Sequence, residues 1–482
     1  MAEPSMAPSA APQPPQPQQP PVYPHPEPYT ANVLLRLRRG LHSWFGLLNE
    51  WDFRVPLGRI DVLGRPLFLV SDPPLVRQLL VDQVDRFPKH PFTLWLLEPL
   101  IGRGIFSVNG AEWARQRRLI DQAFQAAQLR QVLPQMQGAI QAMVQRLELA
   151  GGGAVDIEAE MTLVTADVIV RTILSRPLEA AEAADILRSF QRYQQRAGRA
   201  LVLRLLQWPG ALLKRYLARH AGTIRGWIAA VIEERLAAPA GSEPPAGSEP
   251  PRDLLQALLE AQDPETGSSF SAQELVDQVC TLFLAGHETS ASALGMACYL
   301  LAQFPEAQQR LRLEVEAALA GQERPLEFDD LRRLPYGTAL FNETLRLYPP
   351  LSFFIREAAA DGALGQSRCP LGALLAVSPW VIQRHEQHWS DPNAFRPERF
   401  LAECATVEER AWARDAWLPF GLGPRKCPGA AFALQEALLV LAELVRRQRL
   451  LPEPGHRPDL VGRLTLRSRN GIQLRLERLS RS

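Results

Sequence analysis

The sequence predicts a mainly α-helical protein with small β-sheets, folded as one large domain. Apolar residues recur at helical spacing from Pro73 to about Ala237 and again from Asp253 to about Pro350. Short alternating stretches, typical of strands, occur only near Arg65 and after Pro350. Strands do not alternate with helices and no glycine-rich dinucleotide fingerprint occurs, which excludes a doubly wound nucleotide-binding fold.

The elements are predicted in the following order. An amphipathic helix is expected in ANVLLRLRRGLHSWFGLLNEW, from Ala31 to Trp51. The stretches FRVPLG and RPLFLVS follow and predict a short hairpin. After a series of helices broken by Gly and Pro, two prominent helices are expected from Ser271 to Phe304 and from Asp330 to Pro350. Strand-like pieces then follow in FFIREAAAD, GALLAVSPW, RLTLRS and GIQLRLERL.

Two segments carry no hydrophobic periodicity. Residues 1–30 are rich in proline and glutamine and predict a disordered N-terminal arm. Residues 239–251 repeat AGSEPP and predict a flexible surface loop. Because helical patterns flank this loop on both sides, we expect one domain over residues 31–482 rather than two domains joined by a linker.

The composition excludes several classes of protein. The chain has 482 residues and a formal net charge of +1, so its overall charge does not indicate nucleic-acid binding. The five cysteines are scattered and form no CxxC pair, so we expect neither a disulfide framework nor a zinc site. No apolar run is long enough for a transmembrane anchor, and the arm lacks the apolar core of a signal peptide. A cytoplasmic monomer is the resulting prediction.

The segment AGHETS, Ala285 to Ser290, lies in the middle of a predicted helix with apolar neighbours. A glycine inside a helix costs about 1 kcal/mol relative to alanine, so Gly286 implies a flat ligand or a local opening of the helix. Thr289 lies one turn after Ala285 on the same face, with Glu288 beside it. A hydroxyl and a carboxylate there predict a proton relay at a pocket wall. The alternative is an exposed polar turn.

The segment ETLR places Glu343 and Arg346 on one helix face. Such pairs usually lie at the surface and contribute about 0–1 kcal/mol. This pair adjoins the apolar LYPPLSFF, so it is expected to be buried and to need a further partner. Arg399, in RPERF, is the predicted partner.

The segment WARQR places Trp113 and Arg117 four residues apart, so an indole and a guanidinium project together. This combination suits an anionic, partly apolar ligand. The alternative is a solvated basic face with one anchoring tryptophan.

The segment FGLGPRKCPG places Cys427 on a stiff loop just before a predicted helix. The helix dipole, with Arg425 and Lys426, is expected to lower the pKa of the thiol and favour a thiolate. No second thiol or histidine lies near it in the sequence, so a four-ligand zinc site does not fit. A single thiolate suits haem iron, whose porphyrin supplies the other in-plane ligands. A nucleophilic cysteine remains the competing interpretation.

Taken together, AGHETS, ETLR, PERF and FGLGPRKCPG occur in one characteristic order, and the chain resembles the cytochromes P450, of the soluble bacterial type, from about Asn32 onward. The resemblance implies a triangular helical prism around a buried haem b. It also implies an oxidoreductase that uses O2 as co-substrate and NAD(P)H indirectly.

The resemblance implies a role for each matching residue. Cys427 resembles the axial iron ligand, and Glu288 and Thr289 resemble the acid–alcohol pair that supplies protons. Ala285 and Gly286 resemble the residues that let the helix kink and leave room for oxygen. The buried triad that holds the haem-loop side of the core is matched by Glu343, Arg346 and Arg399. The expected haem-binding set is Cys427, Phe420, Gly423, Arg425, Gly429, Trp113, Arg117, Arg356, Ala285 and Gly286. Relatives often carry a His-Arg pair where this chain has Gln383, Arg384 and His385, so a propionate contact there is left open.

The resemblance also indicates the substrate and partners. By position, an apolar substrate pocket draws on Phe92, Trp95, Phe283, Ala285, Leu351, Phe353 and Phe354. The resemblance implies insertion of oxygen into a C–H or C=C bond of a fatty acid, terpenoid or polyketide-like molecule. Electrons are expected from a ferredoxin or flavodoxin and its reductase, docking on a basic patch of Arg115, Arg118, Lys426 and the run from Arg446. The stretch 200–217 is expected to cover the entrance, with peripheral membrane contact as the alternative.

Three rival functions remain open. The protein could use peroxide or isomerise an endoperoxide, which the Glu288–Thr289 pair argues against. It could be a haem-based sensor or carrier without turnover. Cys427 could instead be the nucleophile of a hydrolase.

Overall fold

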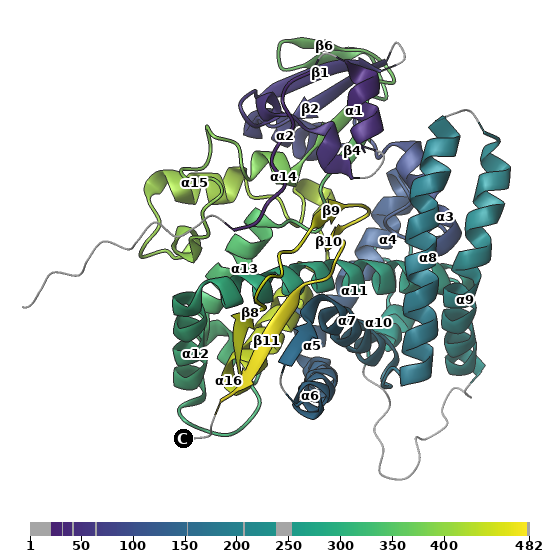
Figure 1. Cartoon of the computed structure of the whole chain (residues 1–482). Helices are drawn as coiled ribbons and strands as arrows, with labels where there is room; N and C mark the ends of the chain where they lie inside the picture. The colour runs from purple at the N-terminus through teal and green to yellow at the C-terminus, as the bar shows by residue number, and fades with distance from the viewer. Residues whose placement is uncertain are drawn as a thin grey trace, which may run out of the picture.

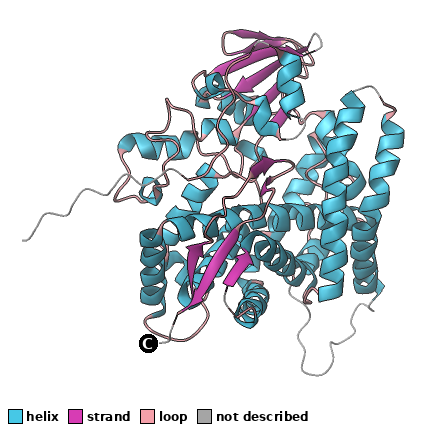
Figure 2. Cartoon of the chain, viewed as in Figure 1, coloured by secondary structure: helices cyan, strands magenta, loops and turns pink. Residues whose placement is uncertain are grey.

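The structure is a computed structural model that describes residues 21–30, 32–40, 43–62, 65–151, 153–205, 208–237 and 253–479. The first twenty residues of the predicted arm and the predicted loop at 239–251 lie outside the described residues. Helices dominate, and the strands gather mainly at one end of the molecule and along one side (Figures 1 and 2). The predicted fold class, mainly α with small sheets, is therefore confirmed.

The helices in the first half of the chain are α1 (Val33–Gly40), α2 (Pro73–Arg77), α3 (Pro91–Ile101), α4 (Gly110–Ala123), α5 (Ala126–Gln131), α6 (Leu133–Leu149), α7 (Ile157–Leu174), α8 (Ala180–Leu205) and α9 (Gly210–Ala237). Those in the second half are α10 (Leu254–Glu260), α11 (Ala272–Gln303), α12 (Pro305–Leu319), α13 (Pro335–Leu347), α14 (Pro379–Ile382), α15 (Val407–Asp415) and α16 (Ala430–Arg447). Short helical turns include η3 (Gln78–Asp82), η5 (Pro397–Phe400) and η6 (Gly423–Arg425).

The largest sheet has four strands in the order β1-β2-β7-β4, and it lies at the top of the view in Figure 1. The predicted hairpin forms its first two strands, β1 (Leu57–Val62) and β2 (Arg65–Val70), with Leu57 opposite Val70. The third strand, β7 (Leu374–Val377), runs parallel to β2 and antiparallel to β4 (Phe354–Glu357). This sheet holds Arg356 at the edge of the helical part.

The remaining strands form three small antiparallel sheets. They are β3 (Gly153–Asp156), β11 (Gln473–Arg478) and β8 (Gln448–Pro452) in one sheet, β9 (Leu460–Gly462) and β10 (Leu466–Ser468) in the second, and β5 (Gly362–Leu364) and β6 (Ser367–Cys369) in the third. The β9–β10 hairpin lies over the middle of α11 in Figure 1, where a hydrogen bond from Ser292 to the carbonyl of Leu466 joins them.

The long helix α11 crosses the centre of the molecule (Figure 1). It begins at a capping box, in which the Ser271 side chain accepts from the backbone N–H of Glu274 and the Glu274 carboxylate accepts from that of Ser271. Most of its residues are buried against α7, α9 and α3. Helices α8 and α9 run side by side along one edge of the molecule. The buried face of α11 thereby fixes where its few accessible residues point.

The folded part of the chain begins earlier than predicted. Residues 21–30, assigned to the arm from their proline content, lie against the core. The backbone of Val22 accepts a hydrogen bond from the Tyr348 hydroxyl (2.6 Å) and donates one to the Tyr299 hydroxyl (3.2 Å). Glu27 forms a β-bridge with Asn49. The prediction failed because a proline-rich segment can dock in extended form without any periodicity of its own.

Candidate active site

The loop from Phe420 to Gly429 closes on itself and presents Cys427 just before α16. The backbone N–H of Cys427 donates to the carbonyl of Phe420 over 2.8 Å, and the backbone N–H of Gly429 donates to the Cys427 sulfur. The surface of the Cys427 side chain is accessible. Protein atoms nevertheless surround it on most sides, and this burial is the largest influence on its pKa. The sulfur therefore faces an internal space rather than the packed core.

Burial raises the pKa of the Cys427 thiol, and this influence exceeds the opposing ones of the Gly429 N–H and of the Arg117 and Lys426 charges. The expectation of a lowered pKa from the loop alone was therefore wrong, because it left desolvation out. Among the described residues, no group of three or more His, Cys, Asp or Glu side chains could hold a metal ion. Cys427 is a free cysteine in the structure.

Gly423 has a φ of +71°, a left-handed conformation that favours glycine. A Cβ at this position would lie 2.2 Å from the carbonyl oxygen of Leu80. Gly423 belongs to the expected haem-binding set, and the neighbour that requires a glycine there is the backbone of η3. Gly429 differs, since a Cβ there would lie 3.9 Å from the Cys427 sulfur.

Three cations converge from separate parts of the chain: Lys89 from the loop before α3, Arg356 from β4 and Arg425 from η6. Lys89 and Arg356 form a β-bridge, and the Lys89 Nζ donates to the carbonyl of Phe106 over 2.6 Å. The Nε atoms of Arg356 and Arg425 are buried without a hydrogen-bond partner among the described residues. We call these three residues the cation cluster.

The electrostatics of the cation cluster are unfavourable in the protein alone. Burial, followed by the charges of Arg425 and Arg356, lowers the pKa of Lys89 well below its usual value. Burial also lowers the pKa of Arg356 and of Arg425 to about 10, and only Asp85 opposes it at Arg425. Within the described residues none of the three forms an ion pair within 4 Å. Like charges held together in this way are suited to an anionic ligand.

Helix α4 supports this region through the two residues predicted from WARQR. The Trp113 ring lies 4.2 Å from the Arg425 guanidinium in a cation–π contact. Arg117 donates to the carbonyl of Lys426 and forms an ion pair with Asp121. Trp113 therefore orients one member of the cation cluster, whereas Arg117 holds the cysteine loop.

Lys89 is a functional candidate that the sequence analysis missed. It stands in FPKHP, within the stretch taken as pocket lining, and no spacing pattern links it to Arg356 or Arg425. The available signal was a lysine in an otherwise apolar stretch, which implies a buried partner or ligand.

On α11, Ala285 is exposed although the helix around it is largely buried. Thr289, one turn later, is partly exposed and donates its hydroxyl proton to the carbonyl of Ala285. These two side chains are thus accessible on a stretch of helix that is otherwise largely buried. At Gly286, by contrast, a Cβ would lie 2.2 Å from the Cδ1 of Ile169 on α7. Its absent side chain admits the Ile169 side chain of the neighbouring helix, and α11 is helical from Ala272 to Gln303.

Glu288 is held away from Thr289 by a buried network. Its carboxylate accepts from Arg467 on β10 (2.6 Å), from the Thr465 hydroxyl (2.6 Å) and from Gln194 on α8 (2.8 Å). Burial acts to raise the pKa of Glu288, but Arg467 and the other partners outweigh it and hold the pKa at about 2. Glu288 is therefore ionised at neutral pH and carries no proton to donate while Arg467 is in place.

The predicted Glu343–Arg346–Arg399 group forms and is fully buried. Arg346 contacts both carboxylate oxygens of Glu343, at 2.6 and 2.8 Å. The Nε of Arg399 lies 3.5 Å from the same carboxylate, and its other nitrogens donate to Ser390, Asp391 and Glu409. The structure thus brings the three residues together, with Glu409 as a second carboxylate that the sequence analysis did not name.

The segment Gln383 to His385 has a structural role in this chain. The Gln383 amide donates to the carbonyls of Leu345 and Arg346 and accepts from the backbone N–H of Leu418. It thereby joins α13 to the segment leading into the cysteine loop. Arg384 stacks over Trp380 at 3.7 Å, and His385 stacks on His388. The Nε and one terminal nitrogen of Arg384 are also buried without a hydrogen-bond partner among the described residues.

The predicted pocket residues separate into two groups. Phe283 is 3% exposed and packs against His287 and Trp227, so it belongs to the interface of α11 with α9. The remaining members with described side chains are exposed or half-buried, as pocket lining requires: Trp95, Ala285, Leu351, Phe353 and Phe354. The Phe92 side chain lies outside the described residues.

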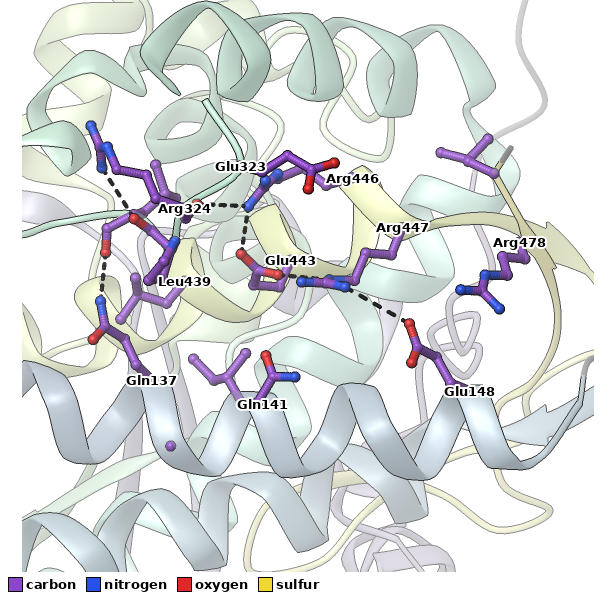
Figure 3. A pocket seen from close by; sticks show the side chains of 15 residues that line it. Gln137, Gln141, Glu148, Glu323, Arg324, Leu439, Glu443, Arg446, Arg447 and Arg478 are labelled. Atoms are coloured by element: carbon purple, nitrogen blue, oxygen red, sulfur yellow. Dashed lines mark hydrogen bonds and ion pairs between the residues drawn. The ribbon is translucent and has the colours of Figure 1, made fainter. Parts of the chain in front are cut away.

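The basic residues predicted to form a docking patch lie on more than one element, and the run from Arg446 is at the opposite end of α16 from Lys426. Arg115 is paired with Glu274 and Arg118 with Asp263. Arg446 lies near the far end of α16, about 24 Å along the helix from its start at 1.5 Å per residue. There a separate cavity of about 470 Å³ opens between α6 and α16. In it both Arg446 and Arg447 contact Glu443 (Figure 3).

Comparisons with known proteins agree with this arrangement. The profile of the family described as Cytochrome P450 matches residues 21–474. Cyclooctatin synthase of Streptomyces melanosporofaciens is 33% identical over 434 residues, 89% of each chain. Pentalenene oxygenase of Streptomyces avermitilis is 30% identical and covers 93% of this chain and 95% of its own.

A solved structure gives the same result for the fold. The heme domain of cytochrome P450DA is 25% identical, covers 88% of this chain and 90% of its own, and superposes with a TM-score of 0.77. No helix in the described part of the chain is long and apolar enough to cross a membrane. With the family profile spanning most of the sequence, the chain belongs to the cytochrome P450 family of haem-dependent monooxygenases.

Proposed function

We propose that this P450 monooxygenase inserts one oxygen atom from O2 into a C–H or C=C bond of a lipophilic small molecule, of the fatty acid, terpenoid or polyketide-like kind. Electrons come from a separate ferredoxin or flavodoxin and its reductase. The single observation that carries the proposal is the accessible Cys427 sulfur on the loop before α16, and the accessible Ala285 and Thr289 side chains of α11 support it.

The residues present fit a haem. Cys427 would bind its iron, and the orphaned donors of the cation cluster would suit its two propionates, whose charges would relieve the like-charge repulsion of the cluster. Trp113 keeps Arg425 in place by stacking on it. When bound, the haem supplies the iron at which O2 is activated and from which oxygen reaches the substrate.

The protein's own residues position the substrate, exclude water and supply protons. The Thr289 hydroxyl, held by the Ala285 carbonyl, stands where it can accept and pass on a proton. Glu288 acts as a fixed anion that ties α11 to β10 and α8, since its carboxylate stays ionised. Trp95, Leu351, Phe353 and Phe354 give the space an apolar lining that excludes water and favours a lipophilic substrate.

Two relatives support the substrate class. Pentalenene oxygenase takes, by its name, an unsaturated hydrocarbon, and cyclooctatin synthase is named for its product. The pocket side chains that the structure describes are apolar, which agrees with such molecules.

The test is a reduced-plus-carbon-monoxide difference spectrum of the purified protein, followed by a lipophilic library screened for low-to-high-spin shifts. We expect the Soret position typical of thiolate ligation, and loss of that position in Cys427→His. A protein with no Soret band after haem supplementation would overturn the proposal and favour the nucleophilic cysteine. Gas binding without NADPH-driven product formation, given a surrogate ferredoxin system, would instead indicate a sensor or carrier.

A further inference from the structure

The cavity at the far end of α16 is distinct from the candidate active site. It has a volume of about 470 Å³ and lies among α6, α16, the loop after α12 and the end of β11 (Figure 3). None of its lining residues belongs to the expected haem-binding or substrate-pocket sets. Its volume lies within the range of about 300–1,000 Å³ that is typical of small-molecule pockets. The mechanism above gives this cavity no role.

The floor of the cavity is apolar. Ile140 of α6, Leu326 of the loop and Leu439 of α16 line it, and each of these side chains is buried. Leu439 and Glu443 lie one turn apart, so one stripe of α16 faces the cavity and changes from apolar to charged toward the end of the helix. An apolar floor accommodates the apolar part of a ligand, because a polar group placed there would lose its hydrogen bonds to water.

Guanidinium groups gather around one carboxylate at the rim. Glu443 accepts hydrogen bonds from the Nη1 of Arg446 (2.8 Å) and the Nε of Arg447 (2.9 Å). The Glu443 side chain is only 13% exposed, so it holds both arginines in a partly desolvated place. Arg478, at the end of β11, forms no ion pair within 4 Å with any residue of the described ranges (Figure 3). This rim therefore has guanidinium donors left for a ligand.

The charges of the lining favour a ligand with one negative charge. The lining contains four arginines and three glutamates, a net charge of +1, and the glutamates would repel a phosphate that carries two charges. Arg324 is already paired with Asp330, outside the lining, so Arg478 is the arginine available to an anion. A planar guanidinium matches a carboxylate through two parallel hydrogen bonds.

We propose that this cavity is a second ligand site, which binds an amphipathic monocarboxylate. The apolar body of the ligand lies on Ile140, Leu326 and Leu439, and its carboxylate accepts hydrogen bonds from Arg478 and from the outer nitrogen of Arg447. Binding is non-covalent and uses only side chains of this chain. The inference goes beyond the proposed function and does not rest on it.

The test is a calorimetric titration of the holoenzyme with 2-naphthoate, which has a flat apolar body and one carboxylate. Saturating 4-phenylimidazole, a ligand of haem iron, is present throughout to occupy the active site. The neutral 2-naphthamide has nearly the same shape and serves as the matched probe. The variants are Arg478→Gln and Gln141→Trp, which fills the cavity from α6. The control is Arg475→Gln, on the same strand but outside the lining, where Arg475 pairs with Glu453.

We expect 2-naphthoate to bind the wild type at one site per chain. Its affinity should fall about tenfold in Arg478→Gln, because a charge-assisted contact is lost, and binding should be absent in Gln141→Trp. Arg475→Gln should bind it like the wild type. The amide should bind about tenfold more weakly than the carboxylate, with no further loss in Arg478→Gln. Added salt should weaken the binding of the carboxylate alone.

Three results would overturn the inference: no binding of 2-naphthoate to the wild type, equal affinity in the wild type and Arg478→Gln, or equal affinity for the acid and the amide. All three variants change exposed side chains, so they should fold, and thermal melting checks this. If Gln141→Trp does not fold, Arg478→Gln and the amide decide. Failure of the proposed function would be seen elsewhere, because the carbon-monoxide spectrum of the wild type would lack the thiolate signature.

Discussion

The cluster around Glu343 and the cation cluster both bury arginines, but only the first contains the partners they need. Arg346 and Arg399 share the Glu343 carboxylate and donate to several backbone carbonyls. Lys89, Arg356 and Arg425 have carbonyl contacts and no carboxylate within 4 Å among the described residues. The difference teaches that a satisfied buried charge supports the fold, whereas an unsatisfied one indicates a ligand.

The largest effect is expected from Glu343→Ala. The change leaves two buried guanidinium groups without their shared carboxylate, and breaking such a network costs about 3–5 kcal/mol. This is a large part of a typical unfolding free energy of about 5–15 kcal/mol. Denaturant unfolding of the purified protein, or failure to obtain soluble protein, measures it. A loss below about 1 kcal/mol would contradict this comparison, because Glu343 would then contribute no more to stability than an exposed ion pair does.

The next effect concerns haem retention in Lys89→Gln and Arg356→Gln. Each change removes a charge-assisted contact worth about 1.5–3 kcal/mol, so haem transfer to an acceptor apoprotein should be about tenfold faster or more. The stability of the haem-free protein should stay equal or increase, because repulsion is relieved. Lys214→Gln, at an exposed lysine paired with Glu98, is the control and should change neither quantity. Unchanged transfer rates in both variants would mean that the cluster does not hold the propionates.

A smaller effect is expected in the pH dependence of the haem-free protein. The pKa of Lys89 is lowered on folding from about 10.5, so the unfolded chain binds more protons. The unfolding free energy should therefore gain from Lys89 as the pH rises from its folded pKa toward 10.5. Urea unfolding between neutral and alkaline pH measures the slope. Lys89→Gln should reduce the slope of the unfolding free energy against pH. Equal slopes in the two proteins would mean that folding does not lower the pKa of Lys89.

The smallest effect is expected from Asp329→Asn. Arg130 and Asp329 form an exposed ion pair, with 54% and 66% of the side chains accessible. Exposed pairs contribute about 0–1 kcal/mol, so unfolding should barely change. A larger loss would show that accessibility does not separate structural from surface charges in this protein.

The sequence predicted the parts of the site that local spacing encodes. Cys427, its loop and the Glu343–Arg346 pair follow from residues within ten positions of one another, and the fold class follows from periodicity. The partners that decide their behaviour come from far along the chain. Arg467 fixes the ionisation of Glu288 from 179 residues away, and Ile169 occupies the space at Gly286.

Burial was the second missing quantity. The cations next to Cys427 are visible in the sequence, but the desolvation that outweighs them depends on the folded surroundings. The place of Lys89 in the cation cluster also depends on the folded chain, because a β-bridge joins it to Arg356. Predictions from neighbouring residues alone therefore gave the wrong direction for the pKa shift of Cys427 and did not include Lys89.

The contacts of Val22 also bear on how the protein is made. Val22 is synthesised early, yet its partners Tyr299 and Tyr348 follow 277 and 326 residues later. At about 5–20 residues per second of synthesis, the delay to Tyr348 is roughly 16–65 s. During translation, Val22 therefore lacks both hydroxyl partners until the middle of the chain is made, so its docking follows the formation of the core around them.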